Sequence, residues 1–351
     1  PVVVKAHPGH MATAELTAEA IVRAVVRCGL PGGVFNMIFG TDIGAELVRH
    51  PAIQAVGFTG SLAGGKALYQ LAQQRPQPIP LFAEMSAINP LIILPQALQT
   101  RAEALANELV ASFTLGGGQF CTRPGLILAL RGAGLERFKS ALCAAVAGST
   151  PQVLLNAPTL QHYRQGVAAL AAHPRIEKLA SGLVAGAGQA QTLLWQAQVE
   201  DLLAQDTLLQ SEVFGPLSLL VEVDDEAQLQ AVVKALQGQL TATVHAEADD
   251  GPLAASLLPL LCEKAGRVLF NGYPTGVEVC DAMVHGGPWP ATTDARGTSV
   301  GSRAIERFLR PVCLQNAPAA LLPPALQDAN PLNLLRLVNG QWTREAISSS
   351  H

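Results

Sequence analysis

The sequence predicts an α/β fold in which crossover helices connect the strands of a parallel sheet. Short apolar runs alternate with stretches of helical periodicity through roughly the first ninety residues. Strand, helix and strand at that spacing indicate parallel pairing. With 351 residues, of which 49% are hydrophobic and 14% charged, the chain can build two domains, or one large domain with an appendage, around a sizeable core.

The elements of the first part follow from periodicity and from end signals. The helix expected over Ala14–Cys28 carries apolar side chains four residues apart on one face, and "GLPGG" ends it. Thr41 or Asp42 can cap a short helix that runs to Arg49. The predicted strands here are Val2–Val4, Gly33–Phe39, Ile53–Phe58 and Ile79–Met85, and the third helix is Leu62–Gln74.

The alternation continues after Asn89-Pro90. A long helix, Arg101–Leu115, is expected to lead into a glycine-rich loop, and roughly the last eighty residues are rich in loops. Because ligands of open parallel sheets bind beyond the carboxyl ends of the strands, we expect the site there. The other predicted helices are Leu135–Val146, Leu160–Ala172 and Glu226–Gln237, and the other strands are Leu126–Leu130, Pro216–Val223, Gln239–His245 and Arg267–Asn271.

Charge and cysteine usage exclude several classes of function. A net charge of −4 without a basic block argues against a nucleic-acid partner. No apolar run reaches the roughly eighteen residues of a spanning helix, so no membrane association is expected. The six cysteines form no CxxC pair and no zinc-type spacing, so no metal site is predicted. Sparse cysteines and the lack of a recognisable signal peptide favour the cytoplasm.

One loop carries the first candidate for chemistry. The stretch "GGGQFCTRPG" places Cys121 behind three glycines and ahead of a Pro-Gly break. A thiolate is a strong nucleophile when its pKa is lowered and its approach is open. Cys143, inside the helical pattern "ALCAAV", has the setting of an inert buried thiol. A single loop cysteine is more often structural than catalytic, so both interpretations of Cys121 remain open at this point.

Glu84 is the second candidate. It lies in "IPLFAEMSAINP", near the end of an apolar strand, where burial would raise the pKa of its carboxyl into the range of a general base. The alternative is a glutamate that simply emerges at the strand end. His7, His10 and His285 have no aspartate at local spacing, and we interpret them as structural.

Three further features could bind a nucleotide. The segment "GFTGSLAGG", residues 57–65, follows a strand and opens a helix, so its free N–H groups suit a phosphate, although an ordinary capped turn gives the same pattern. Lys5 ends the first strand and could reach a ribose or phosphate, or remain solvated. Glu212 and Phe214, in "QSEVFGPL", could hold a ribose and a ring, or form a tight connection.

In this order, the motifs resemble those of the aldehyde dehydrogenase superfamily across residues 1–216. "VVVKAHP" resembles its lysine-bearing ribose strand, "GLPGGVFNMIFG" the next βα connection and "GFTGS" the cofactor loop. "FAEMS" resembles the segment of the glutamate base, "GGGQFC" the nucleophile loop and "EVFGP" the second ribose contact. Residues 270–313 resemble the branch that oxidises 2-oxoglutarate semialdehyde (2,5-dioxopentanoate), which is related to NADP-dependent fatty aldehyde dehydrogenases.

The resemblance implies a fold, a division into domains and roles for residues. It implies a partial Rossmann-like cofactor domain over residues 1–85, an α/β catalytic domain over residues 86–285 and a C-terminal oligomerisation segment over residues 286–351. Cys121 would attack the aldehyde, with its own backbone N–H holding the oxyanion, and Glu84 would activate water to hydrolyse the thioester. The implied cofactor contacts are Lys5, Gly40, Thr59, Gly60, Ser61, Gly65, Glu212 and Phe214, and the substrate candidates are Phe120, Arg123 and Arg296.

Two departures from the family pattern shape the remaining expectations. Pro8 stands where NAD-preferring relatives carry a ribose-binding glutamate, which favours NADP over NAD. Against this, the Thr41–Ile43 segment carries Asp42 and lacks the arginine that some NADP-using relatives place near the phosphate. The chain begins at "PVVVK", after the position of the relatives' oxyanion-hole asparagine and oligomerisation hairpin. We therefore expect an N-terminally truncated fragment with weak or no activity, and a homo-oligomer for the full-length enzyme.

Two alternatives to a semialdehyde dehydrogenase remain open at this stage. One is a long-chain or broad-specificity aldehyde dehydrogenase, which would carry an apolar tunnel in place of a cationic anchor. The other is an inactive remnant that only binds a nucleotide. The presence of both Cys121 and Glu84 argues against the remnant, and the ordered motif series argues against a nucleotide-binding protein of unrelated fold.

Overall fold

The computed structural model describes residues 1–347, and its contacts divide the chain into two compact units. The first unit is Pro1–Arg307 and the second begins at Phe308. The domain limits predicted at residues 85 and 285 remain predictions. The helices are α1 Met11–Arg27, α2 Ile43–Arg49, α3 Leu62–Gln73, α4 Pro95–Thr114, α5 Leu135–Ala147, α6 Ala157–Ala172, α7 Val199–Leu203, α8 Glu226–Ala235 and α9 Gly251–Lys264.

A seven-stranded sheet forms the centre of the first unit. Its order is β13-β12-β5-β6-β11-β10-β8, and every pair is parallel except β10 with β8. This parallel-dominated α/β architecture confirms the predicted fold class. The strands of this sheet are β5 Pro90–Ile93, β6 Leu126–Leu130, β8 Glu177–Ser181, β10 Leu193–Ala197, β11 Leu217–Val223, β12 Gln239–His245 and β13 Ala265–Phe270.

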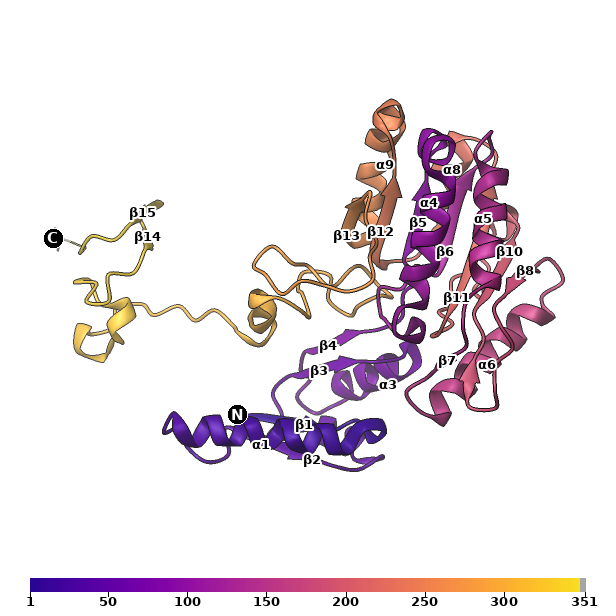
Figure 1. Ribbon diagram of the computed structural model, residues 1–351. Helices are drawn as coiled ribbons and strands as arrows, with labels where there is room; N and C mark the ends of the chain where they lie inside the picture. The colour runs from indigo at the N-terminus through magenta and orange to yellow at the C-terminus, as the bar shows by residue number, and fades with distance from the viewer. Residues whose placement is uncertain (348–351) are drawn as a thin grey trace. The chain divides into compact units, whose positions relative to one another are not determined.

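Helices cover both faces of this sheet because its strands are apolar on both sides. On one face, α4 and α5 bury side chains such as Leu105 and Phe138 against alternate residues of β5 and β6. Figure 1 shows these two helices side by side over the sheet. The other face packs against α6, α7, α8 and α9, with Leu229 and Leu257 fully buried. The result is a three-layer sandwich that fixes the carboxyl ends of the parallel strands.

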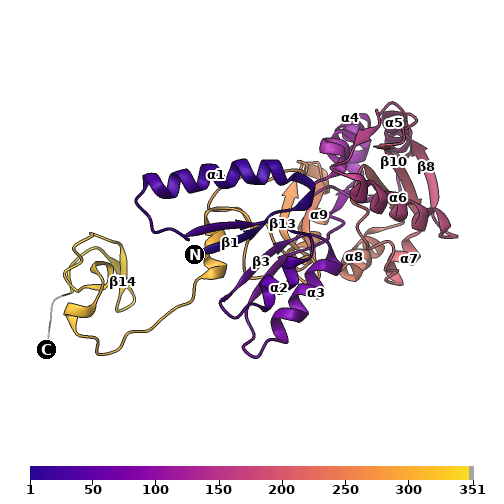
Figure 2. The same ribbon diagram turned by 90° about the horizontal axis from the view of Figure 1, so that it is seen from below.

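Two separate parallel pairs precede the large sheet. Strands β1 (Val2–Lys5) and β2 (Phe35–Ile38) form one pair, and α1 lies along it in both views (Figure 1, Figure 2). Strands β3 (Val56–Thr59) and β4 (Leu81–Glu84) form the other, and a small core between them and helices α2 and α3 includes Val48 and Ala72. The βα alternation predicted for these residues is present as two short sheets.

Several elements differ from the predictions for physical reasons. Helix α4 begins at Pro95, not at Arg101. Arg101 has non-helical backbone angles (φ −129°, ψ 22°), and this kink resets the apolar periodicity, so the pattern predicts only the part of the helix after it. Helix α9 was missed because it is apolar on most sides and contains Pro259. Strands β5, β8 and β10 were also missed.

The second unit contains the antiparallel pair β14 (Arg336–Val338) and β15 (Gln341–Thr343). Asn330 holds the surrounding loop, since its side-chain amide donates to the carbonyls of Leu334 and Arg344. Two short strands, β7 (Gln152–Val153) and β9 (Gln189–Ala190), pair in the first unit. Within residues 1–347, no helix combines the length and the apolar character that a membrane crossing requires.

Candidate active site

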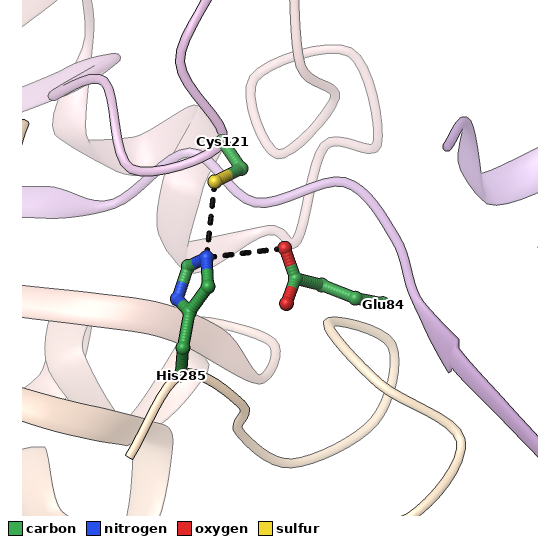
Figure 3. Close-up of side chains that lie close together, drawn as sticks. All are labelled: Glu84, Cys121 and His285. Atoms are coloured by element: carbon green, nitrogen blue, oxygen red, sulfur yellow. Dashed lines mark hydrogen bonds and ion pairs between the residues drawn. The ribbon is translucent and has the colours of Figure 1, made fainter. Parts of the chain in front are cut away.

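Cys121, His285 and Glu84, here called the Cys121 cluster, come together from three distant parts of the sequence. The Sγ of Cys121 lies 3.0 Å from Nε2 of His285, and the same nitrogen lies 3.2 Å from Oε1 of Glu84 (Figure 3). Glu84 and His285 are each only 3% exposed, and Cys121 is partly exposed. A thiol, an imidazole and a carboxylate therefore share one largely buried contact.

The glycine-rich loop positions Cys121 at the end of α4. Gly116, Gly117 and Gly118 all adopt positive φ, which turns the chain sharply after the helix. A Cβ on Gly118 would lie 2.3 Å from the carbonyl oxygen of Gly215, so the loop packs directly on the Glu212–Gly215 turn. Glycine is required here by both the backbone angle and the contact.

Asn89 anchors the same loop from beneath, a role that the sequence did not indicate. Its Nδ2 donates to the carbonyl of Cys121 at 2.8 Å and to that of Arg123 at 3.0 Å. Its Oδ1 accepts from the backbone and hydroxyl of Thr241. A buried amide with all these partners fixes the backbone of the nucleophile loop to strand β12.

Glu84 ends β4 and is held by the C-terminal segment of the first unit. Its backbone forms an isolated β-bridge with Thr292. The hydroxyl of Ser299 donates to Oε2 of Glu84, while the backbone N–H of Ser299 donates to the carbonyl of His285. Ser299 therefore ties the carboxylate of Glu84 to the backbone of His285 and leaves Oε1 facing the imidazole.

The cluster carries opposite charges at neutral pH. Burial opposes ionisation of His285, but its hydrogen bonds with Cys121 and Glu84, and their charges, raise its pKa to about 9. Burial alone would raise the pKa of Glu84, yet the hydrogen bond and charge of His285, with help from Ser299, hold it below the usual value. The expectation of a raised pKa for Glu84 was wrong because it left out His285.

His285 is a member of the Cys121 cluster that the sequence does not predict. The structural interpretation rests on the lack of an aspartate nearby in sequence, whereas the partners of His285 are far away in the chain, Cys121 at a separation of 164 residues. The signal available was its place in "HGGPWP", a turn-rich segment inside the family-like tail. The sequence also does not indicate that Arg267 lies within electrostatic range of Cys121; burial lowers the pKa of Arg267, and Cys121 acts on it in the opposite direction.

The predicted cofactor residues fall into two groups. Thr59 pairs with Glu84 in the β3–β4 register, and Ser61 caps α3 by accepting from the N–H of Gly64 at 3.2 Å. Ser86 links this helix end to the "EVFGP" turn, since its hydroxyl accepts from the N–H of Leu62 and also hydrogen bonds Glu212. Burial raises the pKa of Glu212 to about 7, against the charge of Arg123 and the hydrogen bond of Ser86.

The remaining predicted cofactor residues lie at the turn that follows Glu212, beside α3 and β3, or at the β1–β2 pair. Phe214 is 36% exposed, beside Gly215. A Cβ on Gly65 would meet Sδ of Met85 at 2.5 Å, so α3 packs tightly on the strand that carries Glu84. Gly60 follows β3, and its N–H donates to the carbonyl of Glu84. Lys5 and Gly40 lie at the ends of β1 and β2, in the other strand pair.

The predicted substrate residues are spread more widely. Phe120 precedes the nucleophile, and its ring lies against Gly116. Arg123 is 2% exposed, and its guanidinium donates to the carbonyls of Val213 and Leu217. Arg296 lies at the surface and binds both carboxylate oxygens of Asp294. The structure therefore brings Phe120 close to the cluster, while both arginines point their charge at other partners.

The cluster also brings together three atoms of the kinds that bind metal ions. The Cys121 sulfur, a nitrogen of His285 and an oxygen of Glu84 all lie within 4.8 Å of one another. Sequence spacing gave no sign of this group because its members come from separate segments.

Known proteins match this chain over most of its length. It is 57% identical over 344 residues to an "Alpha-ketoglutaric semialdehyde dehydrogenase" of Acinetobacter baylyi, and 52% identical over 344 residues to "Alpha-ketoglutaric semialdehyde dehydrogenase 2" of Azospirillum brasilense. These matches cover 98% and 97% of this chain and 65% of the length of each relative. The chain therefore spans just under two thirds of either protein.

A solved structure resembles this chain in fold, and a family model matches its sequence. A gamma-glutamyl-gamma-aminobutyraldehyde dehydrogenase from Burkholderia cenocepacia superposes with a TM-score of 0.69 at 21% identity, covering 83% of this chain and 58% of that one, which supports the fold. The model of the "Aldehyde dehydrogenase family" matches residues 1–310. Since that model covers most of the chain and a relative named for an aldehyde dehydrogenase is 57% identical over 344 residues, the chain belongs to the aldehyde dehydrogenase family.

Proposed function

We propose that this chain carries the catalytic machinery for NAD(P)-dependent oxidation of an aldehyde to a carboxylic acid, with 2,5-dioxopentanoate as the substrate. The observation that carries the proposal is the Cys121 cluster, in which a partly exposed thiol contacts a buried imidazole that also contacts a buried carboxylate. The two most similar relatives given above are named for α-ketoglutaric semialdehyde, which is the same compound.

Cys121 performs the first step. Its sulfur adds to the aldehyde carbon, the C=O π bond becomes an oxyanion, and a thiohemiacetal results. The His285 imidazolium next to the sulfur stabilises the thiolate before attack. The backbone N–H of Cys121 is the donor that this chain offers to the new oxyanion. A nicotinamide dinucleotide, when bound, supplies the acceptor for the hydride that leaves the same carbon.

Glu84 and His285 serve the second step, hydrolysis of the thioester on Cys121. At neutral pH the Glu84 carboxylate is ionised, because its pKa is held low, and can take a proton from an attacking water. Water adds to the acyl carbon, the C–S bond breaks, and the thiolate leaves beside the His285 cation. Ser299 keeps Glu84 in the orientation that this step requires.

The donor set at the α3 end suits a dinucleotide. In its first turn the N–H groups of Leu62 and Gly64 are bonded to the hydroxyls of Ser86 and Ser61, so the N–H of Ala63 and the positive end of the helix dipole are what this end offers to a phosphate oxygen. Glu212, joined to the same helix end through Ser86, offers a carboxylate for ribose hydroxyls. Lys5, at the carboxyl end of β1, is proposed for the other ribose. NADP is favoured over NAD because Pro8 removes an acidic side chain from that region.

Arg267 supplies the positive charge that a carboxylated aldehyde needs. Its guanidinium donates to the carbonyls of Pro274 and Gly276, its Nε has no partner among the described residues, and its charge interacts with that of Cys121. None of the ion pairs found among residues 1–347 includes it. A half-buried cation without an anionic partner near the nucleophile supports the oxo-acid class of substrate.

The test uses the protein expressed from its complete gene. We expect NADPH formation with 2,5-dioxopentanoate, loss of at least about 10³-fold of this rate in Cys121→Ser, and recovery of 2-oxoglutarate as product. In Glu84→Gln we expect a burst of about one NADPH per site followed by slow turnover, since only hydrolysis is impaired. Unimpaired steady oxidation by Cys121→Ser would overturn the proposal. Sedimentation of the same protein tests the proposed homo-oligomer.

A further inference from the structure

The Cys121 cluster has the composition of a three-ligand metal site. A thiolate sulfur, an imidazole nitrogen and a carboxylate oxygen are the three donor types that Zn²⁺ binds, at about 2.3, 2.0–2.1 and 2.0–2.2 Å. Around a tetrahedral ion at those lengths, neighbouring donor atoms stand roughly 3.3–3.6 Å apart. The observed separations are 3.0 Å between Cys121 Sγ and His285 Nε2 and 3.2 Å between that nitrogen and Glu84 Oε1.

Only a small rearrangement separates the observed geometry from a bound state. All three atoms lie within 4.8 Å of one another, and Nε2 faces both other donors (Figure 3). The carboxylate is already held from outside, because Ser299 donates to the far oxygen of Glu84; Thr298 holds the backbone N–H of His285, and Nδ1 of its ring has no hydrogen-bond partner among the described residues. Such outer hydrogen bonds orient metal ligands and leave the inner atoms free.

We propose that Glu84, Cys121 and His285 bind Zn²⁺, or a similar borderline-soft divalent ion, and that the bound ion inhibits the enzyme reversibly. The ion replaces the protons shared within the cluster and forms bonds to sulfur, nitrogen and oxygen. A coordinated thiolate shares an electron pair with the ion and is a weaker nucleophile, and the ion also occupies Glu84 and His285, so both steps are slowed until the ion leaves. Sulfur and nitrogen donors disfavour Mg²⁺ and Ca²⁺, which select oxygen ligands.

Binding can be measured without any catalytic assay. Co²⁺ added to EDTA-treated, reduced protein should give a near-ultraviolet band from sulfur-to-cobalt charge transfer and visible bands of tetrahedral intensity, saturating at one ion per chain. Cys121→Ser should lose the charge-transfer band, and His285→Asn should weaken Co²⁺ binding by at least about tenfold. Cys143→Ser, which removes a thiol of α5 outside the cluster, is the matched control and should keep the spectrum.

Inhibition is the second measurement, and it rests on the proposed function. Micromolar Zn²⁺ should stop NADPH formation in the wild-type enzyme and in Cys143→Ser, EDTA should restore it, and millimolar Mg²⁺ should have no effect. His285→Asn should need at least about tenfold more Zn²⁺ for half inhibition of its residual rate. A cobalt spectrum that survives in Cys121→Ser, or is absent from the wild type, overturns the site. A cobalt site without zinc inhibition overturns the inhibitory role, whereas failure of the proposed function alone leaves the spectrum intact.

Discussion

His285 holds the opposing charges of the Cys121 cluster together. As an imidazolium at neutral pH, it neutralises the Glu84 carboxylate, and one ring nitrogen contacts both Cys121 and Glu84. A buried ion pair of this kind is costly unless each partner is satisfied; Ser299 supplies the additional hydrogen bond to the carboxylate, whereas Nδ1 of His285 has no hydrogen-bond partner among the described residues. The cluster is therefore a connected unit in which a change at one residue affects the other two.

Replacing the cation should slow reactions of the thiol. In His285→Asn, the alkylation of Cys121 by iodoacetamide at pH 7 should fall by about tenfold or more, since loss of only ~1.4 kcal/mol of charge stabilisation is a factor of ten. Peptide mass spectrometry of the labelled protein measures the rate. Cys143 in the same sample serves as an internal reference and should label at an unchanged rate. Equal rates at Cys121 in both proteins would contradict a thiolate stabilised by His285.

Ser299 should act on hydrolysis more than on acylation. In Ser299→Ala, Glu84 loses the hydroxyl that fixes Oε2, whereas Cys121 and His285 keep their contact. We expect a near-normal burst of NADPH and a steady rate that is lower by about tenfold, as one hydrogen bond to a charged group is worth ~1.5–3 kcal/mol. Ser299→Thr, which retains the hydroxyl, should recover much of the steady rate. A fall in the burst that matches the fall in the steady rate would point to general damage.

At the scale of elements, the nucleophile loop and the Glu212–Gly215 turn support each other. Gly118 has φ +69°, and its neighbour across the contact is the carbonyl of Gly215. Gly118→Ala should lower the free energy of unfolding by about 2–4 kcal/mol, through backbone strain and overpacking. Urea unfolding measures this. Gly132→Ala, at an exposed loop position with no atoms within 4 Å of the new Cβ, should change it by less than about 0.5 kcal/mol.

The Glu212 turn should also make stability depend on pH. The folded pKa of about 7 lies above the reference value of 4.5, so folding favours the protonated carboxyl. Stability from this group is complete below pH 4.5 and is lost as the pH rises to about 7. Glu212→Gln should therefore be more stable than the wild type at pH 8, by at most about 3 kcal/mol, and much closer to it at pH 5. The exposed Glu263→Gln should show no such pH-dependent gain in urea unfolding.

For the whole molecule, the sequence predicted what depends on local pattern. Strands such as Leu126–Leu130 and Gln239–His245 match because continuous apolar runs bounded by turns define them. The contact between Cys121 and His285 could not be predicted from the sequence, because it depends on a distant segment that packs beside β4 and places Thr292 against Glu84. Periodicity reports which face of an element is buried, but not which distant loop fills the space beside it.

The boundary after Arg307, where the first unit ends, can be tested by limited proteolysis. Residues 309–317 form no helix or strand, and Leu309, Val312 and Leu314 are all more than half exposed. Thermolysin, which cuts before bulky apolar residues, should therefore cleave first in this stretch, because exposed irregular backbone is the preferred substrate of proteases. The large fragment should still alkylate at Cys121 as fast as the intact chain. A first cut near residues 285–286 would instead favour the boundary expected from sequence, and would mean that His285, 3% exposed, leaves the cluster readily.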